Sequence, residues 1–264
     1  MALIKTEAIV LHAAKMGETS KRLKLYTLKR GVVTVVAKGA RSPKSRYGGA
    51  LETLNVLEVV YYDRPTRDMQ ILGQVSIVYV PKKLLFNAET TFLAMACAEM
   101  VSRFENVEES NDAIFGLLRS AIEQFDDPAQ NHRLVLLAFQ LQLLWFLGYA
   151  PQFGQCDACE KAVEQERAFY NISEAKLYCN ECSNDLYSPT LLEPALLNAL
   201  RRLSKTPLHV LRKLDLGKNL LPGIHAFISE FYHHHLEESR YLRSFEVLRQ
   251  MKIFQETHSA KRAK

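Results

Sequence analysis

Residues 20–37 read SKRLKLYTLKRGVVTVVA, and this stretch decides the fold of the N-terminal part of the chain. Its two runs rich in β-branched and aromatic residues, 23–27 and 32–36, flank Arg30-Gly31. Runs of this kind on either side of a turn signal predict neighbouring β-strands. Similar runs at 8–11, 54–62 and 69–80 extend the pattern in both directions. The sequence therefore predicts five strands before residue 81, with no helix of useful length among them.

Five strands in so short a segment favour a small closed or nearly closed β-barrel. The five-stranded oligonucleotide-binding barrel (OB-fold) is the commonest fold of this size, and an SH3-like barrel fits the periodicity almost as well. Beyond Pro81 the apolar residues recur at three- and four-residue spacing, which predicts helices. The predicted helices cover residues 84–104, 113–125, 134–147, 191–203, 225–236 and 245–254. The fold class expected for the whole chain is α+β and multidomain.

The length of 264 residues, with 48% hydrophobic residues, suggests roughly two domains with real cores. Changes of pattern divide the chain further. We expect a nucleic-acid-binding barrel at 1–80, a helical domain at 81–150, a small cysteine-bearing insert at 151–188, C-terminal helices packing on the helical domain at 189–255, and a disordered basic tail at 256–264. No stretch reaches the ~20 apolar residues of a membrane span. Lys5 and Glu7 interrupt what would be the apolar core of a signal peptide, and no small-residue cleavage site follows. We therefore expect a protein of the reducing cytoplasm.

The charge of the chain is polarised. Residues 1–46 hold eleven bases against two acids, whereas residues 47–264 hold 23 bases against 27 acids. A cluster so dense in bases and so poor in acids indicates a module that binds a polyanion. The alternative, that these lysines only solvate the faces of strands, is less favoured. We therefore expect the N-terminal module to be the only basic part of the protein.

Four of the five cysteines fall in one segment, as Cys156-x2-Cys159 and Cys179-x2-Cys182. This spacing is typical of a four-thiolate zinc site, and a hairpin with arms at 168–172 and 176–178 would bring the two pairs together. Four thiolates leave no position for water or substrate, so such a site is structural. Two disulfides, an iron site of the same geometry and coincidence are the alternatives, and the compartment disfavours the disulfides.

Two other sets of potential ligands carry less weight. Cys97 lies on an apolar helical run and is expected to be a buried small hydrophobe. The run at 233–235 is His-His-His, but successive helical side chains point about 100° apart and cannot chelate one ion together.

Catalytic motifs are absent from the sequence. The phosphate-binding pattern G-x-x-x-x-G-K-[ST] is not completed after Gly39, and H-E-x-x-H, G-x-S-x-G and G-x-G-x-x-G do not occur. A nuclease built from scattered carboxylates stays open, although the basic segment offers only two acids for a two-metal site. Three classes follow: a DNA-binding protein that is not an enzyme, a zinc-containing nucleic-acid-binding regulatory factor without annealing activity, and a metal-dependent nuclease.

Three N-terminal segments resemble the RecO family of bacterial recombination mediators and DNA repair proteins: GETSK at 17–21, TLKRG at 27–31 and AKGARSPKSR at 37–46. The four-cysteine segment and the region of Ser244 follow in the expected order, so the similarity covers about residues 2–250. The histidine run and the tail beyond Gln255 depart from the pattern. The resemblance implies an OB-fold barrel, a helical middle and a zinc-stabilised insert in a bacterial, nucleoid-associated protein of the RecF pathway.

The same resemblance implies partners. They are single- and double-stranded DNA, whose complementary strands the protein anneals, and RecR, with which it loads RecA onto strands coated by single-strand-binding protein. The C-terminal tail of that protein would dock on the helical domain.

The residues themselves predict how DNA is held. Residues 1–80 contain no Phe or Trp, and the barrel core is expected to consume several of the five tyrosines, so platforms for base stacking are scarce while cations are plentiful. We therefore expect a grip on phosphate that leaves base edges free. The predicted DNA-binding side chains are those of Lys38, Arg41, Lys44 and Arg46 on a mobile loop around Gly39, and of Lys21, Arg22 and Lys24 on the neighbouring strand. Plain solvation is the alternative for Lys21 and Lys24.

Overall fold

The computed structural model describes residues 2–64, 66–104, 110–164, 166–184, 186–216, 218–236 and 242–250. They form a mixed α+β protein, as expected, in which two compact units span Met1–Pro128 and Ala129–Lys264. The division therefore groups the first two long helices with the N-terminal sheet. The finer five-part division stays a prediction, and its basic tail at 256–264 lies outside the described residues. In the described part of the chain, no helix is long and apolar enough to cross a membrane.

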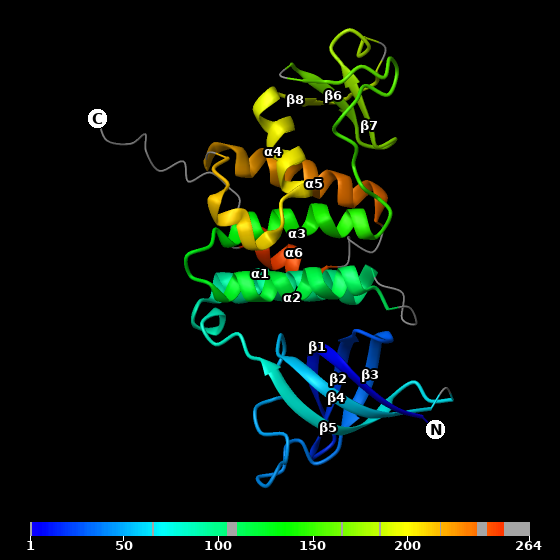
Figure 1. The fold of residues 1–264 in the computed structure, drawn as a ribbon, viewed down its shortest axis with the longest axis vertical. Helices are drawn as coiled ribbons and strands as arrows, with labels where there is room; N and C mark the ends of the chain where they lie inside the picture. Colours follow the sequence, from blue (N-terminus) through cyan, green and yellow to red (C-terminus); the bar gives the residue numbers. More distant parts are fainter. Residues whose placement is uncertain are drawn as a thin grey trace, which may run out of the picture. The chain divides into compact units, whose positions relative to one another are not determined.

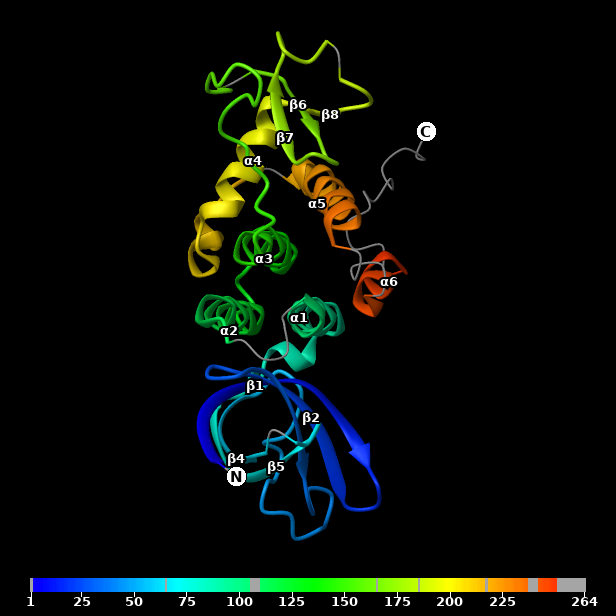
Figure 2. The same cartoon turned by 90° about the vertical axis from the view of Figure 1, so that its right-hand side faces the viewer.

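The N-terminal sheet has five strands, close to the five predicted runs. They are β1 (Ala2–Met16), β2 (Ser20–Thr27), β3 (Gly31–Ala37), β4 (Val56–Asp63) and β5 (Gln70–Tyr79). Their order is β1-β2-β3-β5-β4, and pairing between β4 and β1 closes the barrel that Figure 2 shows. Strand β1 can serve both neighbours because residues 2–9 pair with β4 and residues 8–16 with β2, with a register shift between Val10 and His12.

The barrel interior follows the two-residue period of the strands. Leu23, Leu25 and Val35 are fully buried in it, together with Leu57 and Val59 from β4. The alternate positions of β2 face outward. On this outer side Tyr26 stacks on Phe115 at 6.1 Å between ring centroids, so its ring is also buried.

The expectation of a mobile loop after β3 is wrong. Ala40, Tyr47, Ala50 and Leu51, all between β3 and β4, belong to the buried core of the barrel. The Tyr47 hydroxyl donates to the carbonyl of Leu72 at 3.3 Å. The sequence hid this because the apolar residues of the segment are irregularly spaced among glycines and bases. The segment packs against the barrel, so its cations are carried on a fixed support.

Helices α1 (Ala88–Phe104) and α2 (Asp112–Asp126) complete the first unit. The predicted helix at 84–104 is interrupted, because the short 3-10 helix η1 (Leu84–Phe86) ends at Asn87, whose backbone is extended. The Asn87 side chain then accepts from the backbone N–H of Thr90 and caps α1. Figure 2 shows α1 and α2 side by side, and in both Figure 1 and Figure 2 they lie next to the barrel.

The second unit is built on α3 (His132–Phe146), whose residues 134–141 are all buried. Three elements contact it: α4 (Pro194–Lys205), the 3-10 helix η2 (Leu208–Lys213) and α5 (Leu221–His235). A short 3-10 helix η3 (Lys218–Leu220) precedes α5, and α6 (Arg243–Gln250) ends the described chain, so residues 251–254 of the last predicted helix lie outside it.

The cysteine-bearing part of this unit is a small three-stranded sheet of β6 (Ala168–Asn171), β7 (Lys176–Cys179) and β8 (Thr190–Leu192), in the order β7-β6-β8. The two predicted hairpin arms are β6 and β7. Strand β8 includes residues 191 and 192, which were predicted to be helical. It ends before Pro194, which begins α4 because a proline is well tolerated in the first helical turn.

Candidate metal centre and nucleic-acid interface

The two Cys-x2-Cys pairs, far apart in sequence, lie next to each other in the small insert. The first pair is in a tight turn, in which the Cys156 N–H donates to the Lys161 carbonyl and the Glu160 N–H donates to the Cys156 carbonyl, both at 2.9 Å. The second pair begins at the last residue of β7. The Asp157 N–H donates to the Leu177 carbonyl at 2.7 Å, and this bond holds the first turn against β7.

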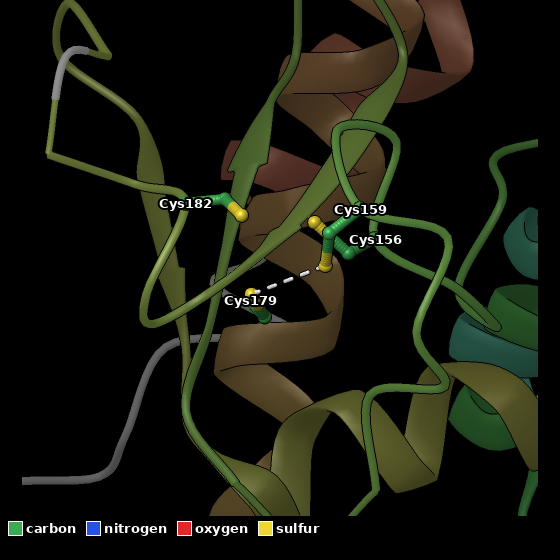
Figure 3. A group of neighbouring side chains, drawn as sticks. All are labelled: Cys156, Cys159, Cys179 and Cys182. Carbon is green, nitrogen blue, oxygen red and sulfur yellow. Dashed lines mark hydrogen bonds between the residues drawn. The ribbon is translucent and has the colours of Figure 1, made fainter.

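The four sulfur atoms face one another in Figure 3. All lie within 4.8 Å of each other, and the Sγ atoms of Cys159 and Cys179 are 3.9 Å apart. Four thiolates at the usual Zn–S distance of about 2.3 Å form a tetrahedron with edges of about 3.8 Å. The cluster therefore fits a tetrahedral metal ion, as the spacing predicts.

The thiols differ in how readily they ionise. Burial raises the pKa of the Cys156 thiol, but hydrogen bonds from the backbone N–H groups of Cys179, Cys159 and Ala158 outweigh it and lower the pKa to about 6. Hydrogen bonds with the thiols of Cys179 and Cys159 raise the pKa of Cys182 to about 12. Thus one thiolate forms easily, whereas the complete set requires a cation to offset its charge.

The insert is fixed to the helices by side chains that the sequence did not single out. Arg201 of α4 donates to the carbonyls of Phe153 and Val163, which flank the first cysteine turn. The rings of Phe153, Tyr170 and Phe227 pack together, with centroids 5.0 to 5.8 Å apart. The sequence carries no signal for Arg201, because its partners are backbone atoms more than thirty residues away.

The histidine run takes no part in the metal centre. His233 and His234 are exposed, as expected for a helix surface. The His235 ring packs 4.3 Å from the Phe231 ring, and its Nε2 lies 2.6 Å from the Ile172 carbonyl, so it helps to hold the β6–β7 turn against α5. Cys97 is fully buried in α1, as predicted.

The segment after β3 and the β1–β2 hairpin meet at one end of the barrel. The Arg41 N–H donates to the Thr19 carbonyl at 2.8 Å, and its guanidinium donates to the carbonyls of Gly17 and Glu18 at 3.1 and 3.0 Å. Gly39 has a φ of +70°, which favours glycine. Two of the segments that resemble the RecO family, 17–21 and 37–46, are therefore neighbours in space.

Most of the predicted DNA-binding cations at this end are exposed. Lys38, Lys44 and Arg22 make no ion pair or side-chain hydrogen bond within the described residues. Arg46 donates to the Tyr47 hydroxyl at 2.9 Å and lies over its ring, but this partner is neutral. These side chains, together with Arg41, are available to a polyanion.

Lys21 and Lys24 have partners within the protein. The Lys21 ammonium pairs with the Glu52 carboxylate at 2.7 Å. The Lys24 ammonium donates to the Ser102 carbonyl at 2.8 Å, in the last turn of α1, where a cation also favours the helix dipole. Burial, followed by the charge of Arg103, lowers the pKa of Lys24. Their contact with DNA stays a prediction, and the partners compete with it.

Most tyrosines of the barrel are buried or hydrogen-bonded within the protein. Tyr26, Tyr47 and Tyr61 are buried, and Tyr79 donates to Asp126 at 2.8 Å. Tyr62, at 40% exposure, is the one exposed Phe, Tyr or Trp side chain among the described residues of 2–80. An arrangement rich in cations and poor in exposed rings suits contact with phosphates better than with bases.

Fold and site together define an α+β protein that combines a basic five-stranded barrel with a helical part whose small-sheet insert bears four thiols that could hold a metal ion. Residues 1–81 match the family described as Recombination protein O N terminal, and residues 85–244 match Recombination protein O C terminal. The chain belongs to the RecO family. This membership supports a role in DNA repair and recombination.

Curated relatives cover nearly the whole chain. The protein named DNA repair protein RecO of Chlorobium limicola is 28% identical over 258 residues, which cover 94% of this chain and 98% of the relative. The protein of the same name from Salinibacter ruber is 26% identical over 250 residues, which cover 95% of each chain.

Proposed function

We propose that this protein is a recombination mediator that binds single- and double-stranded DNA and anneals complementary strands. With RecR, it helps to load RecA onto strands coated by single-strand-binding protein. The observation that carries this proposal is the set of exposed cations at one end of the barrel, held on a fixed support with few aromatic rings beside them. Gripping the backbone while leaving base edges free is what annealing requires.

The barrel itself supports the proposal. A closed five-stranded barrel in which β3 pairs with β5 and β1 with β4 has the connectivity expected of an OB-fold, in which the loop between the first two strands contributes to the binding surface. Here that loop is bonded through Arg41 to the segment that carries Lys38 and Lys44. We therefore assign the DNA site to this end of the barrel.

We further propose that the protein is not an enzyme and that the bound metal is structural zinc. When bound, the ion would cross-link the first cysteine turn to β7, with Cys156, Cys159, Cys179 and Cys182 as ligands. Four thiolates complete its tetrahedron and leave no site for substrate. Magnesium-dependent cleavage of DNA by the purified protein would contradict this assignment.

The first prediction concerns salt. If Arg22, Lys38, Arg41, Lys44 and Arg46 each neutralise one phosphate, the logarithm of the association constant for single strands should fall with log salt at a slope of about −3.5. Fluorescence anisotropy with a labelled oligonucleotide measures it, and annealing of two complementary strands should slow in the same salt range. A slope near zero would refute electrostatic binding of the phosphates. A mobility-shift assay in dilute buffer in which the protein retards no oligonucleotide would refute it as well.

The second prediction concerns the loop cations. The double change Lys38→Ala, Arg41→Ala should weaken binding to all sequences alike and reduce the slope by about 1.4. Because Arg41 also bonds the β1–β2 hairpin, the pair Lys38→Ala, Lys44→Ala tests the same idea without removing that contact. Lys82→Ala, Lys83→Ala, which removes equal charge from exposed positions outside the site, is the control. Loss of sequence preference instead of uniform weakening would indicate base readout.

A further inference from the structure

The second unit contains a basic segment that the net charge of residues 47–264 does not reveal. Residues 194–214, which form α4 and η2, contain five bases and no acid, although residues 47–264 as a whole are acidic. The N-terminal module is therefore not the only basic part of the protein. Four of the five bases, Arg202, Lys205, Arg212 and Lys213, are exposed.

These four cations are not used within the protein. Within the described residues, none of their side chains makes an ion pair or hydrogen bond, in contrast to that of Arg201, which is turned inward to the cysteine insert. Each pair lies in the last turn of its element, Arg202 and Lys205 in α4 and Arg212 and Lys213 in η2, where a cation favours the helix dipole. This effect needs no partner side chain, so the four charged groups can still meet a ligand.

The supports of these side chains are rigid. Leu200 and Leu203 of α4, and Leu208 and Leu211 of η2, are buried. The junction between the two elements is fixed by Gln142 of α3, whose Nε2 donates to the carbonyls of Leu203 and Thr206 at 3.0 and 2.8 Å. The backbone that carries the four exposed cations is thus held in place by contacts within the protein.

The segment itself lacks an anchor for a peptide. Among residues 194–214 no large hydrophobic side chain is exposed, so these residues do not supply the apolar anchor on which protein partners usually depend. Exposed, unpaired cations on two consecutive elements, without such an anchor, suit a sugar-phosphate backbone, for which charge dominates affinity. His209, exposed one 3-10 turn before Arg212, lies on the same side of η2.

We propose that Arg202, Lys205, Arg212 and Lys213 form a second DNA-backbone site, so that one copy of the protein holds two strands, one on each unit. The inference rests on the proposed function, because it supplies the second strand that annealing needs. Two sites on one chain raise the effective concentration of one strand near the other without base-specific contacts.

The test measures how many strands one copy binds. Oligonucleotides of about twelve thymidines, too short to span several sites and unable to pair with each other, are labelled with a donor or an acceptor dye. Wild-type protein should bind two, with energy transfer between the dyes, and sedimentation should give the mass of one protein copy with two strands. The variant Arg202→Gln, Lys205→Gln, Arg212→Gln, Lys213→Gln should bind one strand, lose the transfer and anneal complementary strands more slowly.

Matched variants locate the effect. Each half of the fourfold change, Arg202→Gln, Lys205→Gln or Arg212→Gln, Lys213→Gln, should lower the salt slope of the second binding event by about 1.4. Lys82→Gln, Lys83→Gln removes the same charge from the first unit and should leave two strands bound. Thermal melting that matches wild type shows that the variants are folded.

The possible outcomes separate the two proposals. If wild type binds one strand, or the fourfold variant still binds two, the second site is overturned while DNA binding by the barrel stands. If wild type binds none, both proposals are overturned. If the variant keeps two strands but loses binding of a fluorescent peptide of ten glutamates, the surface serves an acidic protein and the second DNA site is overturned.

Discussion

At the scale of single residues, Arg201 and Arg202 are neighbours in sequence with opposite environments. Arg201 donates to the carbonyls of Phe153 and Val163, both in buried residues, and burial lowers the pKa of its guanidinium. Arg202 is exposed. The helical rotation of about 100° per residue produces this difference, so identical residue types at adjacent positions predict different roles.

Substitution of Arg201 should therefore destabilise the second unit. Arg201→Met leaves two carbonyls without their donor, and loss of hydrogen bonds from a charged group should lower the unfolding free energy by about 2–3 kcal/mol. Arg201→Lys keeps one donor and should restore part of the loss. Arg202→Met should change stability by less than about 0.5 kcal/mol. Chemical denaturation measures all three, and equal effects at the two positions would contradict the role of Arg201.

The residue scale also shows what the sequence can and cannot predict. The four cysteines were predicted from spacing alone, because two residues between thiols set the geometry of a turn locally. The partner of Lys24 could not be predicted, since its ammonium reaches Ser102, 78 positions away. Ligand spacing within a turn can be read from the sequence. The partner of a long side chain cannot, because it depends on which helix packs beside it.

At the scale of elements, Asp126 joins three segments of the first unit. As the last residue of α2, it accepts from the backbone N–H groups of Lys83 and Leu84 at 2.6 and 2.8 Å, and from the Tyr79 hydroxyl. It therefore fixes the end of β5 and the start of η1 to α2. Burial and then the hydrogen bond to Asp126 raise the pKa of Tyr79 above its ordinary value of 10.0.

This raised pKa predicts a pH dependence. Above pH 10 the unfolded chain loses the Tyr79 proton while the folded protein keeps it, so the contribution of Tyr79 to stability is complete below pH 10 and declines as the pH rises further. Tyr79→Phe should be less stable than wild type at pH 8, and the difference should narrow by pH 11. Denaturation of both proteins at the two pH values measures it. A difference that stays constant or widens would show that Tyr79 is not a proton donor to Asp126.

Element prediction succeeded where the pattern was regular. All five strands and the long helices were anticipated, because period 2 and period 3.6 each place apolar residues on one face. It failed at the segment between β3 and β4, where Ala40, Tyr47 and Leu51 enter the barrel core without any period. It failed also at β8, whose pairing with β6 is a tertiary contact that residues 190–192 do not encode.

At the scale of the whole molecule, the chain places its proposed functions in two compact units. The four-thiol centre belongs to Ala129–Lys264, together with α3, whereas the barrel and its cations belong to Met1–Pro128. Sequence composition located the first basic surface because it fills the N-terminus. It missed the five bases of residues 194–214, because the charge was summed over residues 47–264, which contain 27 acids.

Metal removal should consequently affect one unit and spare the other. A structural ion present at about 1,000 times its Kd contributes about 4 kcal/mol to the unit that binds it, which corresponds to a fall in Tm of about 10–20 °C for a unit of this size. Trp145, the single tryptophan, lies in α3 and so reports on the second unit. A chelator should lower the transition followed by Trp145 fluorescence. It should leave unchanged both the remaining transition in circular dichroism and the affinity of the barrel for a single strand.

A variant with Cys156→Ser and Cys159→Ser is the matched control, since it removes the first cysteine turn as a source of ligands. It should melt like chelated wild type and respond no further to the chelator. If the chelator shifts neither transition, the thiols hold no stabilising ion. If the chelator lowers the temperatures of both transitions equally, the metal stabilises the whole chain and not only the unit that contains its ligands. An ion that binds one independent unit stabilises only the folded state of that unit, so it cannot shift the transition of the other.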